Sequence, residues 1–137
     1  MTGLNELHIL IAEDDLDDGE IIEASFEKHN AFAKVDLVRN GRELLDYLRQ
    51  SKQKPDVILT DINMPILNGI DALKEICTDD GLQGIPAFVY STTINPIYEA
   101  KCMELGTKGF LIKPYSLAEY DQIPNKILEI LRQNKNA

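Results

Sequence analysis

Polar side chains that could do chemistry stand directly after four short apolar runs of this sequence: Glu13 and Asp14, Asp61, Ser91, and Lys113. Carboxylates gathered at one place repel one another and attract a divalent cation, and hard oxygen ligands suit Mg²⁺. A carboxylate can also be a nucleophile toward phosphorus, and the transfer then needs mainly positioning and charge neutralisation. A hydroxyl could donate a hydrogen bond to a phosphoryl oxygen. These residues therefore predict a site at which Asp61 is phosphorylated with the help of Mg²⁺.

The four groups can meet only if the apolar runs are strands of one parallel sheet. Strands are predicted at 7–12, 34–38, 56–60, 87–90 and 109–112. Helices are predicted at 16–29, 42–51, from 69 onward, at 96–105, and from Pro124 to about 133 after one short turn. This alternation indicates an α/β fold, a doubly wound, flavodoxin-like sheet with helices on both faces. The strand order 2-1-3-4-5 fits it, and such sheets bind ligands at the carboxyl ends of their strands.

Length and charge exclude several classes of protein. The 137 residues favour one domain spanning 1–137, with a core at about 7–133 and no output domain. The net charge of -9 disfavours nucleic acid and anionic membranes as partners. No apolar run is long enough to span a bilayer and the first residues do not resemble a secretory signal, so a cytoplasmic location is expected. Cys77 and Cys102 are expected to be reduced thiols.

The four motifs together resemble the receiver domain of two-component response regulators, the family of the bacterial chemotaxis regulator. The matching segments are residues 9–15, Asp61–Pro65 with Gly69 beyond it, Tyr90–Thr92, and Lys113–Pro114. Each motif alone is common, but their order and spacing match over residues 7 to about 133. The segments 14–18 and 41–48 are similar to receivers that accompany phytochrome-type or hybrid kinases.

The resemblance implies a role for each matching residue. Asp61 corresponds to the phospho-acceptor and Lys113 to the cation that meets the phosphoryl group, so these two are the implied catalytic residues. Ser91 corresponds to the hydroxyl that stabilises the phosphoryl group, and with Phe110 it forms the implied switch. The implied ligands of Mg²⁺, or alternatively Mn²⁺, are Glu13, Asp14, Asp61 and the backbone carbonyl of Asn63. The resemblance also implies a cis Lys113–Pro114 bond.

The implied function is a phosphorylation-dependent signalling switch. A sensor histidine kinase or a histidine phosphotransfer protein would donate the phosphoryl group to Asp61. The protein would catalyse only its own phosphorylation and dephosphorylation and would not otherwise be an enzyme. Its output would go to a protein partner or a homodimer, through the face made by the fourth helix, the fifth strand and the fifth helix.

Plainer interpretations of the same residues stay open. Ser91 could cap a turn, and Phe110 could simply pack in the core. The acids Asp17, Asp18, Glu20 and Glu23 are best explained as a solvated helix start or a partner surface, rather than as metal ligands. A Mg²⁺ phosphohydrolase of the haloacid dehalogenase type is the second candidate, although that class has an acid where Asn63 stands. A flavodoxin-like cofactor binder is the third, although residues 13–15 would repel a phosphate.

Overall fold

The computed structural model describes residues 6–136; residues 1–5 and 137, which the predicted single domain includes, lie outside the described residues. The strands are β1 (Leu7–Ala12), β2 (Phe32–Val38), β3 (Val57–Asp61), β4 (Ala87–Ser91) and β5 (Gly109–Ile112). The helices are α1 (Leu16–Glu27), α2 (Gly41–Gln50), α3 (Gly69–Thr78), α4 (Pro96–Glu104), α5 (Leu117–Tyr120) and α6 (Ile123–Asn136). Strands and helices alternate along the chain, as the apolar periodicity predicts.

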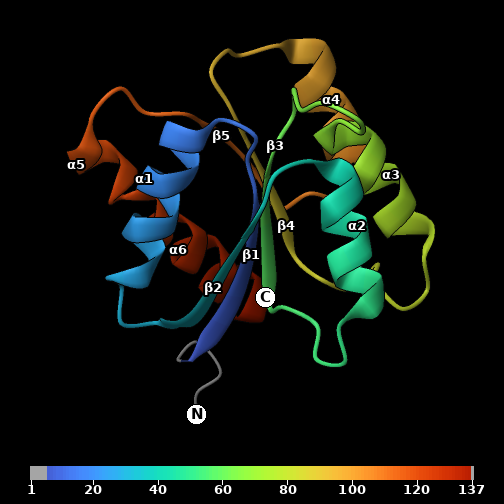
Figure 1. Cartoon of the computed structure of the whole chain (residues 1–137), viewed down its shortest axis with the longest axis horizontal. Helices are drawn as coiled ribbons and strands as arrows, with labels where there is room; N and C mark the ends of the chain where they lie inside the picture. The colour runs from blue at the N-terminus through green and yellow to red at the C-terminus, as the bar shows by residue number, and fades with distance from the viewer. Residues whose placement is uncertain (1–5, 137) are drawn as a thin grey trace.

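The five strands form one parallel sheet in the order β2-β1-β3-β4-β5, which confirms the predicted doubly wound topology (Figure 1). The register brings the carboxyl ends of the strands side by side. Ala12 pairs with Thr60 of β3, and Asp61 pairs with Tyr90 of β4. Ser91 in turn pairs with Ile112 of β5. The residues that follow β1 and β5, and those that end β3 and β4, therefore share one edge of the sheet.

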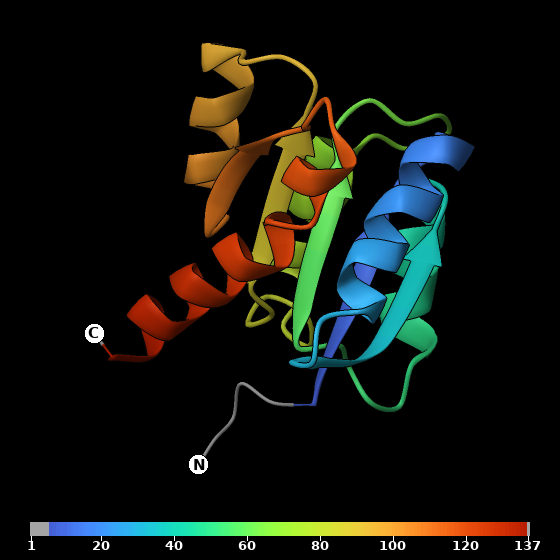
Figure 2. The same ribbon diagram turned by 90° about the vertical axis from the view of Figure 1, so that its left-hand side faces the viewer.

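Helices cover both faces of the sheet, with α1, α5 and α6 on one side and α2, α3 and α4 on the other (Figures 1 and 2). Alternate residues of β1 pack into the two hydrophobic layers, one on each face of the sheet. Ile9 and Ile11 pack toward the α1 and α6 side, whereas Leu10 and Ala12 pack toward the α2 and α3 side. All four are fully buried, which explains why this strand is a continuous apolar run.

Capping residues fix where the helices begin. The side chains of five residues at helix N-termini accept hydrogen bonds from the backbone of the first turn: Asp15, Asn40, Asn68, Asn95 and Ser116. Pro124 lies in the first turn of α6, where a missing N–H costs little. The predicted break between a short turn and a fresh final helix is therefore confirmed.

Two predicted boundaries shift at the α1–β2 connection. Helix α1 ends at Glu27 rather than His29, because the N–H of His29 donates to Phe26 and its own carbonyl accepts from Phe32, which closes a tight turn. Strand β2 begins at Phe32 rather than residue 34. Phe32 is buried and pairs with Leu7, and a register irregularity separates this pair from the next one, His8 with Lys34. The strand therefore begins earlier than the residue, Lys34, at which the sequence predicts its start.

Over residues 6–136, no helix has both the length and the apolar character needed to cross a lipid bilayer. Cys77 and Cys102 are both free thiols, and Cys102 is buried in the core beside α3. They behave as the sequence predicts for small hydrophobic residues.

Candidate functional site

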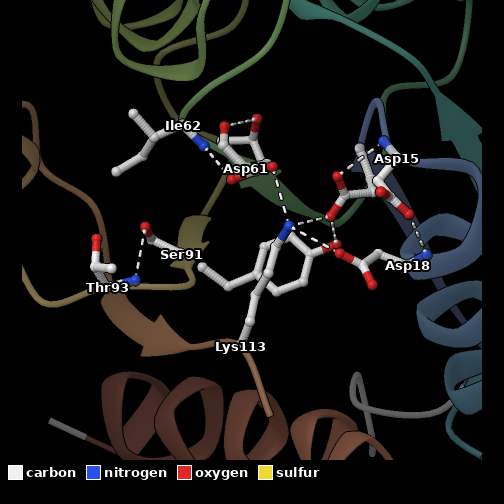
Figure 3. Close-up of polar contacts among 10 residues, drawn as sticks. Asp15, Asp18, Asp61, Ile62, Ser91, Thr93 and Lys113 are labelled. Carbon is white, nitrogen blue, oxygen red and sulfur yellow. Dashed lines mark hydrogen bonds and ion pairs between the residues drawn. The ribbon is translucent and has the colours of Figure 1, made fainter. Parts of the chain in front are cut away.

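Four strands deliver the predicted site residues to one edge of the sheet (Figure 3). Glu13 follows β1, Asp61 is the last residue of β3, and Lys113 follows β5. All three side chains are buried, with at most 10 % of each exposed. Ser91 ends β4 at the same edge and is buried as well. The prediction that these residues come together is correct for the acids and the lysine.

The ammonium group of Lys113 is the centre of the site. Its Nζ lies 2.7 Å from Oε1 of Glu13 and 3.0 Å from Oδ2 of Asp61. A third carboxylate, that of Asp18 in the first turn of α1, lies 3.4 Å away. Although burial alone would lower the pKa of Lys113, the hydrogen bond to Glu13 and the charges of Asp61 and Glu13 raise it above its usual value. Lys113 is therefore a permanent cation.

Glu13 is held by hydrogen bonds on both carboxylate oxygens. Oε1 accepts from the hydroxyl of Tyr90 at 2.7 Å as well as from Lys113, and Oε2 accepts from the backbone N–H of Asp15 at 3.2 Å. Tyr90 is fully buried in β4, and burial together with the charge of Glu13 raises its pKa well above the usual value. Its hydroxyl therefore stays protonated and remains a donor. Sequence reasoning gave Tyr90 no role, because a tyrosine in a central strand is indistinguishable from core packing.

Asp61 combines a buried position with a strong electrostatic field. Its Oδ1 accepts from the N–H of Ile62 at 2.7 Å, so that Oδ2 faces Lys113. Burial and the negative charge of Glu13 raise the pKa of Asp61 to about 6, and Lys113 and the Ile62 N–H oppose that shift. Above that pKa the carboxylate is ionised, and the negative charge of Glu13 repels it. A bound cation, or an electrophile that reacts with Asp61, would reduce this repulsion.

Three carboxylates are close enough to hold one metal ion. Glu13, Asp14 and Asp61 each offer an oxygen, and these oxygens all lie within 4.8 Å of one another. Asp14 is exposed, and its pKa is raised by partial burial and by the charge of Glu13. The donor set fits a hard divalent cation. Asp14 is the most exposed of the three, whereas both oxygens of Glu13 and both of Asp61 already accept hydrogen bonds.

The loop after β3 is shaped around Asp61. The N–H of Gly69 donates to the carbonyl of Ile62 at 2.8 Å, and a Cβ at position 69 would collide with the carbonyl oxygen of Asp61. Only glycine allows this close return of the chain. Within the loop, Ile66 has a φ of 72° and is 81 % exposed, a strained conformation for a β-branched residue. Asn63 is exposed in the same loop, two residues after Asp61.

Over residues 6–136, neither predicted switch residue, Ser91 or Phe110, forms a hydrogen bond with the acidic cluster. Ser91 accepts a long hydrogen bond of 3.5 Å from the N–H of Thr93, and no hydrogen bond joins it to Asp61 over the described part of the chain (Figure 3). Phe110 is half-buried and packs against the core on the α2 and α3 side. Thr92 is exposed. This arrangement leaves both the switch roles and the plainer interpretations of Ser91 and Phe110 as predictions.

One expectation from the sequence is wrong. No peptide bond between residues 6 and 136 is cis, so the Lys113–Pro114 bond is trans. The trans chain still brings the ammonium to the acids, because the N–H of Lys113 continues the strand pairing by donating to the carbonyl of Ser91 at 2.8 Å. Asp18 lies in the first turn of α1, as the sequence predicts, and its carboxylate also contacts Lys113, which the sequence does not predict.

Comparison with known proteins places this geometry in one family. The model of the response regulator receiver domain matches residues 9–123. The chain is 32% identical over 133 residues to the two-component response regulator ARR15 of Arabidopsis thaliana, covering 90% of the chain and 63% of that protein. It is 32% identical over 113 residues to hybrid signal transduction histidine kinase M of Dictyostelium discoideum, covering 80% of the chain and 5% of that protein. The chain thus spans less than two thirds of the length of these relatives.

Solved structures agree with the sequence relatives. The phosphorylated cyanobacterial phytochrome response regulator RcpA is 32% identical and superimposes with a TM-score of 0.83, covering 90% of this chain and 92% of that one. The Mn²⁺-bound response regulator Rcp1, at 24% identity and a TM-score of 0.80 over 90% of this chain and 95% of that one, shares the fold. In this chain, the cluster of Glu13, Asp14 and Asp61 has the oxygen ligands that suit a divalent metal ion.

Proposed function

The chain belongs to the response regulator receiver domain family, and we propose that it works as a phosphorylation-dependent switch that accepts a phosphoryl group on Asp61. The observation that carries the proposal is the contact between Asp61 and Lys113. A buried carboxylate with a raised pKa lies 3.0 Å from a permanent cation and beside two further acids. This pairing supplies a nucleophile and the charge that its product needs.

The residues of this chain account for the transfer step. One oxygen of Asp61 attacks the phosphorus of a phosphohistidine or of a small phosphodonor, and the bond from phosphorus to the leaving group breaks with its electron pair. Lys113 neutralises the charge on the transferred oxygens. Glu13, held by Tyr90, keeps Lys113 in place. Transfer of the phosphoryl group to water returns Asp61 to the free carboxylate. In this proposal the protein catalyses only its own phosphorylation and dephosphorylation and is not otherwise an enzyme.

We propose Mg²⁺ as the physiological metal, held by Asp14 and Asp61 with the carbonyl of Asn63, and by Glu13 through water. Mg²⁺ keeps several waters and binds few protein carboxylates, which suits a site whose acids lie beside an exposed carboxylate, that of Asp14. When bound, it neutralises charge on the carboxylates and on the phosphoryl oxygens. Mn²⁺, which prefers similar oxygen ligands, is the alternative.

The proposed partners are a histidine kinase or a phosphotransfer protein, in the cytoplasm where ATP is available. Exposed apolar residues occur at the start of α1, in the connection from β5 to α5 and at the start of α5: Leu16, Tyr115 and Leu117. They suit the helix that carries a phosphohistidine. The output face would be α4, β5 and α5, where Ile97, Met103 and Ile112 are exposed. Nucleic acid and membrane are not proposed, because the acids would repel both.

The proposed switch couples the site to that output face. Ser91 would turn toward phosphorylated Asp61, and Phe110 would move inward to fill the vacated space. Beryllofluoride, a phosphoryl mimic, should change oligomeric state in light scattering or capture of a kinase-pathway partner. Ser91→Ala and Phe110→Ala should weaken that change while leaving Asp61 phosphorylation intact. No change of assembly or partner capture in the wild type would contradict the switch.

The basic function is tested with acetyl phosphate and Mg²⁺ on a phosphate-affinity gel. Wild-type protein should shift, whereas Asp61→Asn should not, although it folds. Chelation of the metal with EDTA should abolish the shift. An undiminished shift of Asp61→Asn would overturn the assignment of the acceptor.

A further inference from the structure

Asp18 contacts Lys113 from the helix layer rather than from the sheet edge. Its backbone N–H donates to Oδ1 of Asp15 at 2.9 Å, which fixes the first turn of α1. From there its carboxylate points at the ammonium of Lys113, with Oδ2 3.4 Å from Nζ (Figure 3). The neighbouring acid Asp17 is exposed, and its side chain forms no hydrogen bond or ion pair within residues 6–136. Only one of two adjacent acids therefore reaches the site.

All three N–H donors of the Lys113 ammonium have a carboxylate partner. A lysine ammonium has three N–H donors, and Lys113 has three carboxylate partners in Glu13, Asp61 and Asp18. A phosphoryl oxygen arriving at Asp61 can accept from Lys113 only if one of these contacts is released. The three contacts differ in what release would cost.

The solvent exposure of the three carboxylates indicates which of their contacts with Lys113 is the least costly to break. The side chain of Glu13 is fully buried and that of Asp61 is 10 % exposed, so either would be left as a buried charge without its cation. The side chain of Asp18 is 34 % exposed and its contact is the longest of the three. Water can replace its lost partner. Tyr120 of α5 also faces Asp18; burial and the charge of that carboxylate raise the pKa of Tyr120 to about 12, so its hydroxyl stays a donor.

We propose that Asp18 is a positioning residue that competes with the incoming phosphoryl group for Lys113. In the resting protein it holds the third N–H of the ammonium, and that contact is the one exchanged for a phosphoryl oxygen. The inference rests on the function proposed for Asp61. It predicts that Asp18 weakens binding of the phosphodonor. It also predicts that phosphorylation breaks the contact between Asp18 of α1 and Lys113, which follows β5.

The test compares three variants during phosphorylation by acetyl phosphate with Mg²⁺. Asp18→Asn should lower the donor concentration at half-maximal rate about fivefold, the factor equivalent to ~1 kcal/mol for an ion pair whose acid is partly exposed, with little change in maximal rate. Asp17→Asn removes the same charge from the same turn and should change that concentration much less. Asp18→Glu restores the charge and should return it toward the wild-type value.

A second readout needs neither metal nor phosphodonor. The NMR signals of the Lys113 side chain, assigned by their loss in Lys113→Met, should move in Asp18→Asn and stay in place in Asp17→Asn. Equal donor kinetics of Asp18→Asn and Asp17→Asn, in a wild type that is phosphorylated normally, would overturn the inference alone. A wild type that takes up no phosphoryl group would overturn the proposed function and this inference with it.

Discussion

Replacing Asp61 by asparagine should stabilise the metal-free protein at neutral pH. The pKa of Asp61 is raised from 3.8 to about 6 by burial and by the charge of Glu13. The folded state therefore binds this proton more tightly than the unfolded state, and stability falls as pH rises from about 4 to about 6. A rise of roughly two pKa units corresponds to ~3 kcal/mol at most, because one unit is about 1.4 kcal/mol.

The gain expected for Asp61→Asn is about 2 kcal/mol at pH 7, because the amide keeps an oxygen for Lys113 but accepts a weaker hydrogen bond than the carboxylate does. Urea unfolding with EDTA present measures it, and the midpoint should rise by about 1 M. At pH 4 wild-type Asp61 is already protonated when folded, so the two proteins should become similar. Asp17→Asn, which removes an exposed acid, should show no such pH-dependent gain.

Two outcomes would refute this reasoning. A variant that is less stable than wild type at pH 7 would mean that the ion pair with Lys113 outweighs burial and the repulsion from Glu13. A gain that is equal at pH 4 and pH 7 would mean that the charge of Asp61 is not its source.

Three further predictions concern the surroundings of the site. Tyr90→Phe keeps the ring but removes the buried hydroxyl that donates to Glu13, and should cost about 2 kcal/mol in urea unfolding; an unchanged midpoint would show that this hydrogen bond contributes nothing. Ile66→Asn relieves a left-handed backbone at an 81 % exposed position and should raise the melting temperature by a few degrees, about 1 kcal/mol; a lower melting temperature would contradict the strain. Mg²⁺ at about ten times its Kd should stabilise wild type by about 1.4 kcal/mol in a thermal melt, and Asp14→Ala should lose that gain; equal gains in both proteins would remove Asp14 from the metal site.

The sequence was sufficient for the sheet order and for most of the site, because both depend on backbone periodicity. Continuous apolar runs followed by polar residues identify buried parallel strands and their carboxyl ends, and Glu13, Asp61 and Lys113 are displayed there by the backbone alone. Contacts that depend on the direction of a side chain were not predictable. Asp18 and Asp17 are equivalent in the sequence, and only the packing of α1 against the sheet turns one of them toward Lys113.

Tyr90 illustrates the same limit within a strand. Its ring is part of the core, which its position in β4 predicts, whereas its hydroxyl reaches Glu13, which follows β1, a strand that is not a neighbour of β4. Nothing in the spacing of the chain signals that contact. The Lys113–Pro114 bond was expected to be cis by resemblance alone, and resemblance does not determine the isomer that this chain adopts.

The most direct test of the account is to locate the acyl phosphate itself. Protein treated with acetyl phosphate and Mg²⁺ is reduced with borohydride, which converts an aspartyl phosphate into homoserine, and its peptides are sequenced by mass spectrometry. The account predicts homoserine at position 61 and at none of the acids of residues 13–18. Conversion at one of those acids instead, or none at position 61 in protein that carries the phosphoryl group, would contradict it.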